Sequence, residues 1–236
     1  MVSKQPARKP TPFDDTIENG AARHQFEIIY PLLKQLYPTP KCGLDFENPF
    51  QLLIATILSA QCTDVRVNMI TPALFKRFPD PAAMAEANPA ELEKLIYTCG
   101  FYHNKAKSIL GASKKIVEDY GGQVPQTMEE LLKLPGVARK TGSVVLGNAF
   151  GINDGIAVDT HVTRLVARLG LSNNTDPVKI ERDLMALTPR EEWTNVSHRL
   201  IWHGRLVCEA RRPRCEACLL APHCPSRITP LEVPAP

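Results

Sequence analysis

Helix-capping side chains divide this chain into short segments, and no segment keeps the strict apolar–polar alternation of a half-buried strand. Five times a good capping residue stands directly before a proline, which suits the first position of a helix because no amide is needed there. These pairs are Asn48-Pro49, Asp80-Pro81, Asn88-Pro89, Asp176-Pro177 and Thr188-Pro189. The pattern predicts an all-α protein.

The caps and the apolar positions between them predict eleven helices, over residues 24–37, 49–59, 64–77, 81–86, 89–98, 104–120, 128–133, 139–149, 160–169, 177–187 and 190–207. Pro31 falls inside the first helix, where we expect it to kink the helix or to mark its true start. Residues 1–20 and 226–236 are rich in proline and poor in apolar residues, so we expect them to be tails.

Composition excludes several classes of protein. Hydrophobic residues make up 44% of the chain and charged residues 22%, which is typical of globular proteins and excludes wholesale disorder. The longest nearly apolar run, Phe50 to Ala60, has eleven residues, whereas a membrane span needs about 20. The first residues lack the apolar core of a secretory signal. Seven cysteines, an odd number, therefore favour a reducing compartment over a disulfide framework.

The net charge of +3 is itself weak support for a nucleic-acid partner, because Lys4, Arg8 and Lys9 near the N-terminus account for it. The local distribution is more informative. Residues 199–227 carry six arginines and only two acidic residues. This segment is therefore the candidate surface for phosphates.

Four cysteines are grouped near the C-terminus: Cys208, Cys215, Cys218 and Cys224. Four thiolates so close in sequence suit a soft-metal centre. Structural zinc sites usually have two Cys-x-x-Cys pairs and this segment has one, while a proline after the fourth cysteine is typical of ferredoxin-like runs. The spacing favours a 4Fe–4S cluster and leaves zinc or a chance grouping of cysteines as the alternatives.

Between the first two of these cysteines lies a loop that carries Arg211, Arg212 and Arg214. A metal centre would hold this loop rigid and make it a basic surface for DNA phosphates. The alternative is an ordinary solvated loop.

A second motif is the segment Leu-Pro-Gly-Val-Ala-Arg-Lys-Thr at 134–141. A short helix, a Pro-Gly turn and a second helix make a helix–hairpin–helix. Free backbone amides around Gly136 and Ala138, and at the start of the second helix, would bind DNA phosphates without reading sequence. An ordinary corner between two helices is the alternative.

Lys140 and Asp159 form the third candidate. Lys140 stands in the first turn of a predicted helix, where the positive end of the helix dipole disfavours a lysine, and such local conflicts often mark function. Asp159 precedes the next predicted helix and could be only an N-cap. The intervening residues are long enough for the two side chains to meet.

Two polar interruptions complete the candidate set. Ser-Ala-Gln-Cys-Thr-Asp at 59–64 separates two predicted helices, and Cys-Gly-Phe-Tyr-His-Asn at 99–104 follows a helix end. Simple capping and satellite core packing are the plain interpretations of both.

Taken together, these motifs resemble the endonuclease III family of DNA glycosylase/AP lyases, in the helix–hairpin–helix superfamily with an iron–sulfur cluster. The similar segments are SAQCTD (59–64), GFYHNKA (100–106), LPGVARKTGSVVL (134–146), VDTHVTR (158–164), WHGRLVC (202–208) and the cysteine group. The resemblance runs from about residue 24 to 225.

The resemblance implies a two-lobed helical fold. Residues 42–153 would form a six-helix barrel that contains the hairpin, and residues 21–41 with 154–225 would form the iron–sulfur cluster domain. Double-stranded DNA with oxidised pyrimidines or abasic sites would bind between the lobes. The resemblance further implies a cytoplasmic, nucleoid-associated monomer without membrane contact.

For the site, the resemblance implies that Lys140 is the nucleophile and that Asp159 assists it. Lys140 must be neutral to attack, and we expect its removal from water to supply most of that change. Gln61 would fill the gap that an extruded base leaves, and Phe101 stands where the family carries an intercalating residue, often leucine. Ala138 replaces a usual hairpin glycine. The alternatives are a monofunctional mismatch glycosylase and a non-catalytic iron–sulfur protein that binds DNA.

Overall fold

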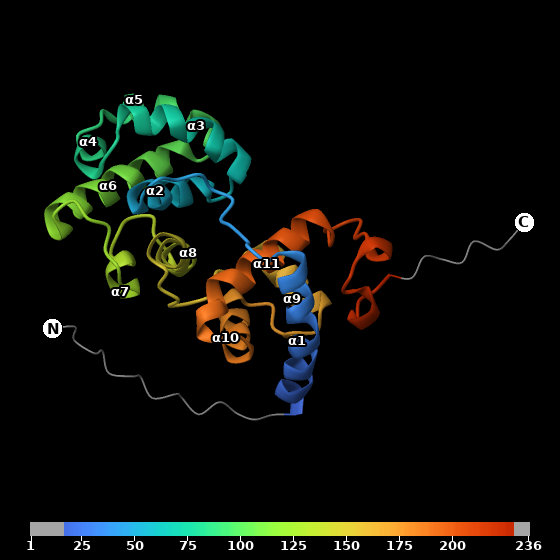
Figure 1. Cartoon of the computed structure of the whole chain (residues 1–236). Coiled ribbons are helices and arrows are strands. Elements are labelled where there is room, and N and C mark those ends of the chain that lie inside the picture. The colour runs from blue at the N-terminus through green and yellow to red at the C-terminus, as the bar shows by residue number, and fades with distance from the viewer. Residues whose placement is uncertain (1–16, 229–236) are drawn as a thin grey trace, which may run out of the picture.

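The computed structural model describes residues 17–228, and all regular elements in that part of the chain are helices, as predicted (Figure 1). The outer parts of the two expected tails, 1–16 and 229–236, lie outside the described residues. The α-helices are α1 (Ile17–Leu36), α2 (Pro49–Ser59), α3 (Asp64–Arg77), α4 (Pro81–Ala85), α5 (Pro89–Ile96), α6 (Tyr102–Tyr120), α7 (Met128–Leu131), α8 (Arg139–Phe150), α9 (Thr160–Arg168), α10 (Pro177–Leu187) and α11 (Trp193–Leu206). Short 3₁₀ turns cover Tyr97–Cys99, Arg190–Glu192, Cys215–Ala217 and Ala221–His223.

Four of the five capping residues that precede a proline act as N-caps. Asn48, Asp80, Asn88 and Asp176 each accept a hydrogen bond from a backbone amide in the first turn of the helix that follows. Thr188 does not. It ends α10, and the next α-helix begins only at Trp193, after a 3₁₀ turn. The same residue types can end one helix or begin another, and packing decides between the two.

The first helix differs most from its predicted range. It begins by Ile17, seven residues before the expected residue 24, and it runs through Pro31 to Leu36 without a break. Residues 20–24 are mostly exposed, so no apolar pattern reveals their helix. Packing offsets the amide that Pro31 lacks, because Ile29 and Leu33 beside it are fully buried.

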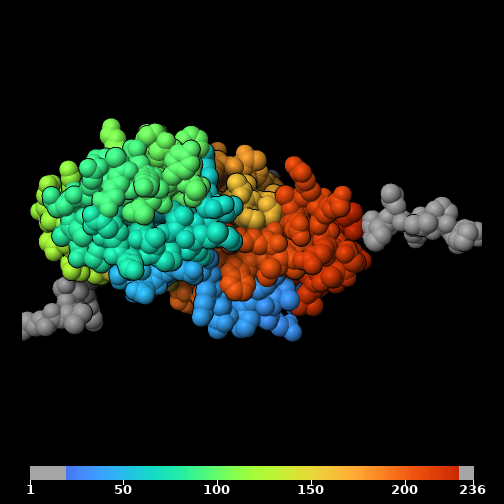
Figure 2. Space-filling model, turned by 90° about the horizontal axis from the view of Figure 1, so that it is seen from above, coloured from blue at the N-terminus to red at the C-terminus, as the bar shows by residue number. Residues whose placement is uncertain are grey.

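The described residues pack around two hydrophobic clusters. The first contains buried side chains of α2 to α8, and the second contains those of α1, α9, α10 and α11 together with Leu220. Figure 2 shows the two groups of residues side by side, with α1 along the edge of the second. Helix α8 contacts α2 of the first group and α11 of the second, so it lies where the two meet (Figure 1).

No helix of residues 17–228 is sufficiently long and apolar to cross a membrane.

Candidate active site and nucleic-acid interface

The predicted hairpin is present between α7 and α8. Gly136 has a φ of 77°, and the amide of Val137 donates to the carbonyl of Leu134 at 3.2 Å. With Pro135 at the second position, this is the pattern of a type II turn, which requires glycine at the third position. A Cβ on Gly136 would also lie 2.6 Å from the Cβ of Ser108 on α6. The turn is therefore fixed both by its own backbone and by α6.

The start of α8 carries free amides and an exposed lysine. Ala138 is the N-cap of α8, and its side chain makes no capping hydrogen bond. Its backbone is extended, with φ −100° and ψ 171°, so this position does not demand the glycine that the family usually carries. The first amides of α8 are thus available to an anion.

Lys140 is the second residue of α8, and its side chain is exposed. We expected desolvation to favour its neutral form, and the described chain by itself does not bury it. Any removal of water from this amine must therefore come from a bound molecule that covers it.

Asp159 is the N-cap of α9, as the plain interpretation predicted. Its Oδ1 accepts from the amide of Val162 at 2.8 Å. The capping bond engages one carboxylate oxygen and leaves the other for a second role. Val158 and Val162 belong to the second hydrophobic cluster, whereas Val145 and Leu146 of α8 belong to the first. Lys140 and Asp159 therefore lie at the starts of two helices that pack in different clusters.

The two polar interruptions are brought together by the fold. Cys62 of the first segment and Cys99 of the second lie close enough for the Cys62 thiol to act on the pKa of Cys99. Burial and this neighbour raise the pKa of Cys99 to about 12. Gln61 and Phe101, which flank these cysteines, are both exposed, and 65% of Phe101 is accessible to solvent.

Buried Lys105 holds the second segment in place. Its Nζ donates to the carbonyl of Cys99 at 2.6 Å, and burial lowers its pKa. We did not predict this role, because nothing in the spacing of Lys105 distinguishes it from a surface residue of α6.

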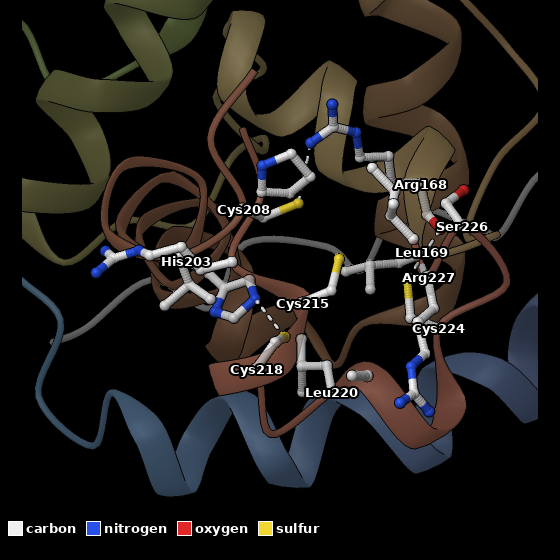
Figure 3. Close-up of a pocket in the computed structure, with 15 residues that line it drawn as sticks. Arg168, Leu169, His203, Cys208, Cys215, Cys218, Leu220, Cys224, Ser226 and Arg227 are labelled. Atoms are coloured by element: carbon white, nitrogen blue, oxygen red, sulfur yellow. Dashed lines mark hydrogen bonds between the residues drawn. The ribbon is translucent and has the colours of Figure 1, made fainter. Parts of the chain in front are cut away.

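The four C-terminal cysteines line one cavity, into which Figure 3 shows their sulfur atoms pointing. Within residues 17–228, no three His, Cys, Asp or Glu side chains converge closely enough to hold a single metal ion. The thiols therefore surround a space rather than a point. Arg168, Arg214 and Arg227 are also among the residues that line the cavity.

Arg168 on α9 contacts the cysteine segment directly. Its Nη1 donates to Cys208 Sγ at 3.2 Å and to the carbonyl of Glu209 at 2.8 Å, and its Nη2 donates to the carbonyl of Ala210 at 2.8 Å. No sequence signal marks this role, because a basic residue in the last turn of a helix is ordinary. Arg168 thus connects α9, whose N-cap is Asp159, to the loop that follows Cys208.

Arg211, Arg212 and Arg214 are exposed, and none forms an ion pair with another residue of the described range. Other arginines of the same region are occupied. Arg205 Nη2 lies 2.7 Å from Asp64 Oδ2 at the start of α3, and Arg199 Nη1 lies 2.7 Å from Glu192 Oε2. The loop between Cys208 and Cys215 therefore carries three of the four arginines of this segment that form no ion pair with a described residue, the fourth being Arg227.

His198 marks the contact between α11 and α8. Its Nε2 lies 2.7 Å from Asn148 Oδ1, and burial lowers its pKa to about 4. Nearby, a Cβ on Gly147 of α8 would collide with Thr194 Oγ1 of α11. These contacts hold the C-terminal half of α8 against the second cluster.

A family model agrees with this arrangement. The model described as "HhH-GPD superfamily base excision DNA repair protein" matches residues 54–190, which are more than half of the chain. That range includes the hairpin, Lys140 and Asp159. The fold and the site thus define a protein of this superfamily of DNA repair proteins.

Similarity to known proteins identifies the family within this superfamily. The chain is 60% identical to endonuclease III of Synechocystis sp. over 84% of its length and 90% of the relative's, and 45% identical to endonuclease III of Bacillus subtilis over 85% and 91%. Among solved structures, a non-covalent endonuclease III–DNA complex matches with a TM-score of 0.83 and 40% identity, covering 86% of this chain and 95% of that one. The structure of a trapped endonuclease III–DNA covalent intermediate has the same TM-score and identity and covers 86% and 96%. The chain belongs to the endonuclease III family.

Proposed function

We propose that this chain excises oxidised pyrimidines from duplex DNA and then cleaves the strand at the resulting abasic site, with Lys140 as the nucleophile. The reaction class, a DNA N-glycosylase with AP lyase activity in base excision repair, follows from family membership. The observation that carries the assignment to Lys140 is its position: an exposed amine in the first turn of α8, directly after a hairpin with free amides.

Binding begins at the phosphates. The uncapped amides at the start of α8 and the backbone of the hairpin would hold one or two phosphates and fix the register of the duplex. The exposed arginines of the loop at 209–214 would add sequence-independent affinity. Neither contact reads a base, which suits an enzyme that must inspect any sequence.

The target nucleotide must leave the helix before its glycosidic bond can be reached, which costs a few kcal/mol and less for a poorly stacked, damaged base. Gln61 and Phe101 stand on adjacent exposed loops and are suited to fill the gap and keep the duplex open. Oxidised pyrimidines, which have lost aromatic stacking, are the substrates that this step favours.

For the chemical step, the neutral Lys140 amine attacks C1′ of the sugar and the base leaves with the glycosidic electron pair. The resulting imine with the opened sugar acidifies the neighbouring carbon, and loss of that proton expels the 3′ phosphate by β-elimination. Because the lysine is exposed in the chain alone, DNA itself must exclude water from it. Asp159 would accept a proton or support the cationic sugar while its other oxygen caps α9.

The cysteine cavity fits a 4Fe–4S cluster better than a single zinc ion. Zinc requires four sulfurs around one point, whereas each cysteine of a 4Fe–4S cluster binds a different iron. Thiols that line a cavity without converging suit the second case, and the guanidinium of Arg168, which donates to Cys208 Sγ, would offset part of the negative charge of such a group. Cys208, Cys215, Cys218 and Cys224 would hold the cluster, which would keep the basic loop in place.

We further propose that the enzyme acts as a monomer on the bacterial chromosome in the cytoplasm.

Borohydride trapping tests the proposal. The full chain is incubated with duplexes that contain thymine glycol, dihydrouracil, an abasic site or 8-oxoguanine. Reduction should attach the wild-type protein covalently to the first three, and Lys140→Ala should abolish trapping and strand cleavage while DNA binding survives. A Lys140→Ala protein that still forms the adduct would mean that another residue is the nucleophile.

Asp159→Asn separates capping from catalysis, because asparagine keeps the cap. Excision should fall by about 10²–10⁴-fold, with folding changed by less than about 1 kcal/mol. Full activity would leave Asp159 as a cap alone. If the wild-type protein excised bases but could not be trapped, a monofunctional mismatch glycosylase would be favoured. If it bound DNA without excising any base, a non-catalytic iron–sulfur protein would be favoured.

A further inference from the structure

An ion pair crosses between the two hydrophobic clusters beside Lys140. Arg139, the first residue of α8, donates from Nε to Glu181 Oε2 of α10 at 2.8 Å, and from Nη2 to the carbonyl of Asp154 at 3.3 Å. Helix α8 packs in the first cluster, while α10 packs in the second. Asp154 begins the segment that ends at Asp159. The Arg139 side chain therefore connects the start of α8 both to α10 and to the segment 154–159, which leads to Asp159.

The Glu181 carboxylate of this pair is enclosed by a close backbone approach, whereas the Arg139 side chain is half-exposed. The Glu181 side chain is only 8% exposed. A Cβ on Gly155 would collide with Glu181 Oε1 and would lie 2.9 Å from Ser143 Oγ and 3.1 Å from Arg139 Nη2. Gly155 is not among the glycines of positive φ, so glycine is required here for space alone. Such enclosure strengthens a charge-assisted hydrogen bond.

Glu181 depends on Arg139 for its charge balance. Its Oε1 has no hydrogen-bond partner within residues 17–228, so the Arg139 contact is what compensates the buried carboxyl. That hydrogen bond also raises the pKa of Arg139. The arginine and the carboxyl therefore hold one another in a single geometry.

The two ends of α8 are secured separately. At the C-terminal half, His198 contacts Asn148 and Thr194 packs against Gly147. At the N-terminal end, which carries Lys140, the Arg139–Glu181 pair is the corresponding contact. Loss of this pair would release the N-terminal end of α8 from α10, while the hairpin would still hold that end against α6.

We propose that Glu181 is a positioning residue: through Arg139 it fixes the Lys140 amine relative to Asp159. The inference rests on the roles proposed for Lys140 and Asp159. Attack on C1′ requires a near-attack geometry, and a displacement of about 1 Å can slow such a step about 10²-fold. Glu181 is buried, so it can act on the rate without touching DNA.

The test compares Glu181→Ala, Glu181→Gln and Gly155→Ala in the full chain. For each, the Kd for a thymine-glycol duplex and the single-turnover rates of excision and borohydride trapping are measured. Glu181→Ala should slow both rates by about 10–100-fold and leave the Kd within about twofold of wild type. Glu181→Gln should restore most of the rate, because its amide oxygen still accepts from Arg139 Nε. Gly155→Ala should slow the reaction with no change of charge.

Glu192→Ala is the matched control. It removes the partly buried carboxyl of another ion pair, that of Glu192 with Arg199 of α11. It should lower stability and leave the single-turnover rate of the folded protein unchanged.

Rates within twofold of wild type in Glu181→Ala would overturn the proposal. The proposal would also be overturned if Glu181→Ala weakened DNA binding without slowing the reaction. The same holds if Glu181→Gln reacted as slowly as Glu181→Ala, or if Glu192→Ala slowed the reaction by the same factor. If Glu181→Ala does not fold, Gly155→Ala decides: a slowed reaction with an unchanged Kd supports the proposal, and a rate within twofold of wild type overturns it. The two proposals can fail separately. If Lys140→Ala abolishes the trapping seen in the wild type but Glu181→Ala reacts at the normal rate, this inference is refuted and the proposed function stands.

Discussion

Gln61 and Phe101 share a left-handed backbone conformation, with φ of 53° and 47°, and they are the two non-glycine residues of the described range that do so. The conformation costs an ordinary residue about 1–2 kcal/mol, and for a bulky side chain it is a genuine outlier. Their loops touch through Cys62 and Cys99. Strain at both of the residues proposed to enter DNA indicates that these loops are shaped for function at some expense of stability.

Replacement of Phe101 by glycine should separate these two effects. Glycine removes the strain, and the largely exposed ring contributes little burial, so the free energy of unfolding should stay equal or rise by up to about 1 kcal/mol. Excision of thymine glycol should fall at least tenfold because the inserting ring is gone. Urea denaturation measures the free energy of unfolding, and single-turnover assays measure the rate of excision. Tyr97→Ala, which removes a ring that is 63% exposed on the neighbouring turn, is the control and should keep full activity.

The cysteine cavity should yield a measurable cluster. Protein purified without oxygen should be yellow-brown and contain about four irons per chain. Cys215→Ser should lose iron and expose the amides of residues 207–228 to hydrogen exchange, because the ligands hold this segment together. Cys42→Ser, whose thiol lies outside the cavity, should retain iron. One zinc per chain with no iron would contradict the prediction.

The exposed arginines predict a salt effect. Alanine at Arg211, Arg212 and Arg214 together should weaken binding to damaged and undamaged duplexes alike. The slope of log K against log salt should fall by about 0.9 for each phosphate that the variant no longer neutralises. Fluorescence anisotropy at several salt concentrations measures the slope. A triple variant with an unchanged slope would show that the loop is only solvated.

His198 should make stability depend on pH. Burial lowers its pKa to about 4 in the folded chain, against about 6.5 when unfolded. The unfolded state therefore binds the proton first as pH falls. The contribution of His198 is complete above pH 6.5 and is lost progressively between about pH 6.5 and pH 4.

From pH 7 to pH 5 this contribution should decrease by about 2 kcal/mol. His198→Gln should be less stable than wild type at pH 7 but should lose less on acidification, as urea denaturation at both pH values would show. His24→Gln, at an exposed position of α1, should keep the wild-type pH dependence. Equal pH dependence in wild type and His198→Gln would refute the assignment.

Ser113 predicts a stabilising substitution. It is fully buried on α6, and its hydroxyl has no hydrogen-bond partner within residues 17–228. Ser113→Ala should raise the free energy of unfolding by about 1–3 kcal/mol, because it removes a desolvated polar group without changing the shape of the site. Thermal and urea unfolding should both show the gain. A loss of stability would mean that the hydroxyl is satisfied in solution.

Most helices and the hairpin could be predicted from the sequence alone. Capping residues and the Pro-Gly turn act over a few residues, and their geometry is set by local backbone chemistry. The cysteine spacing likewise singled out the segment that lines one cavity. The predictions of an N-cap at Thr188 and of a later start for α1 were wrong, because packing decides those ends.

Which distant residues act together became clear only from the packing of the helices. The fold sets Cys62 against Cys99, Arg168 against Cys208, and Arg139 against Glu181. It also leaves Lys140 exposed, so the desolvation that we expected for this amine does not come from the described chain alone. Such pairings join residues far apart in sequence, and their geometry depends on how whole helices pack. No local pattern encodes it, because ordinary arginines and glutamates acquire these contacts only when α8, α9 and α10 meet.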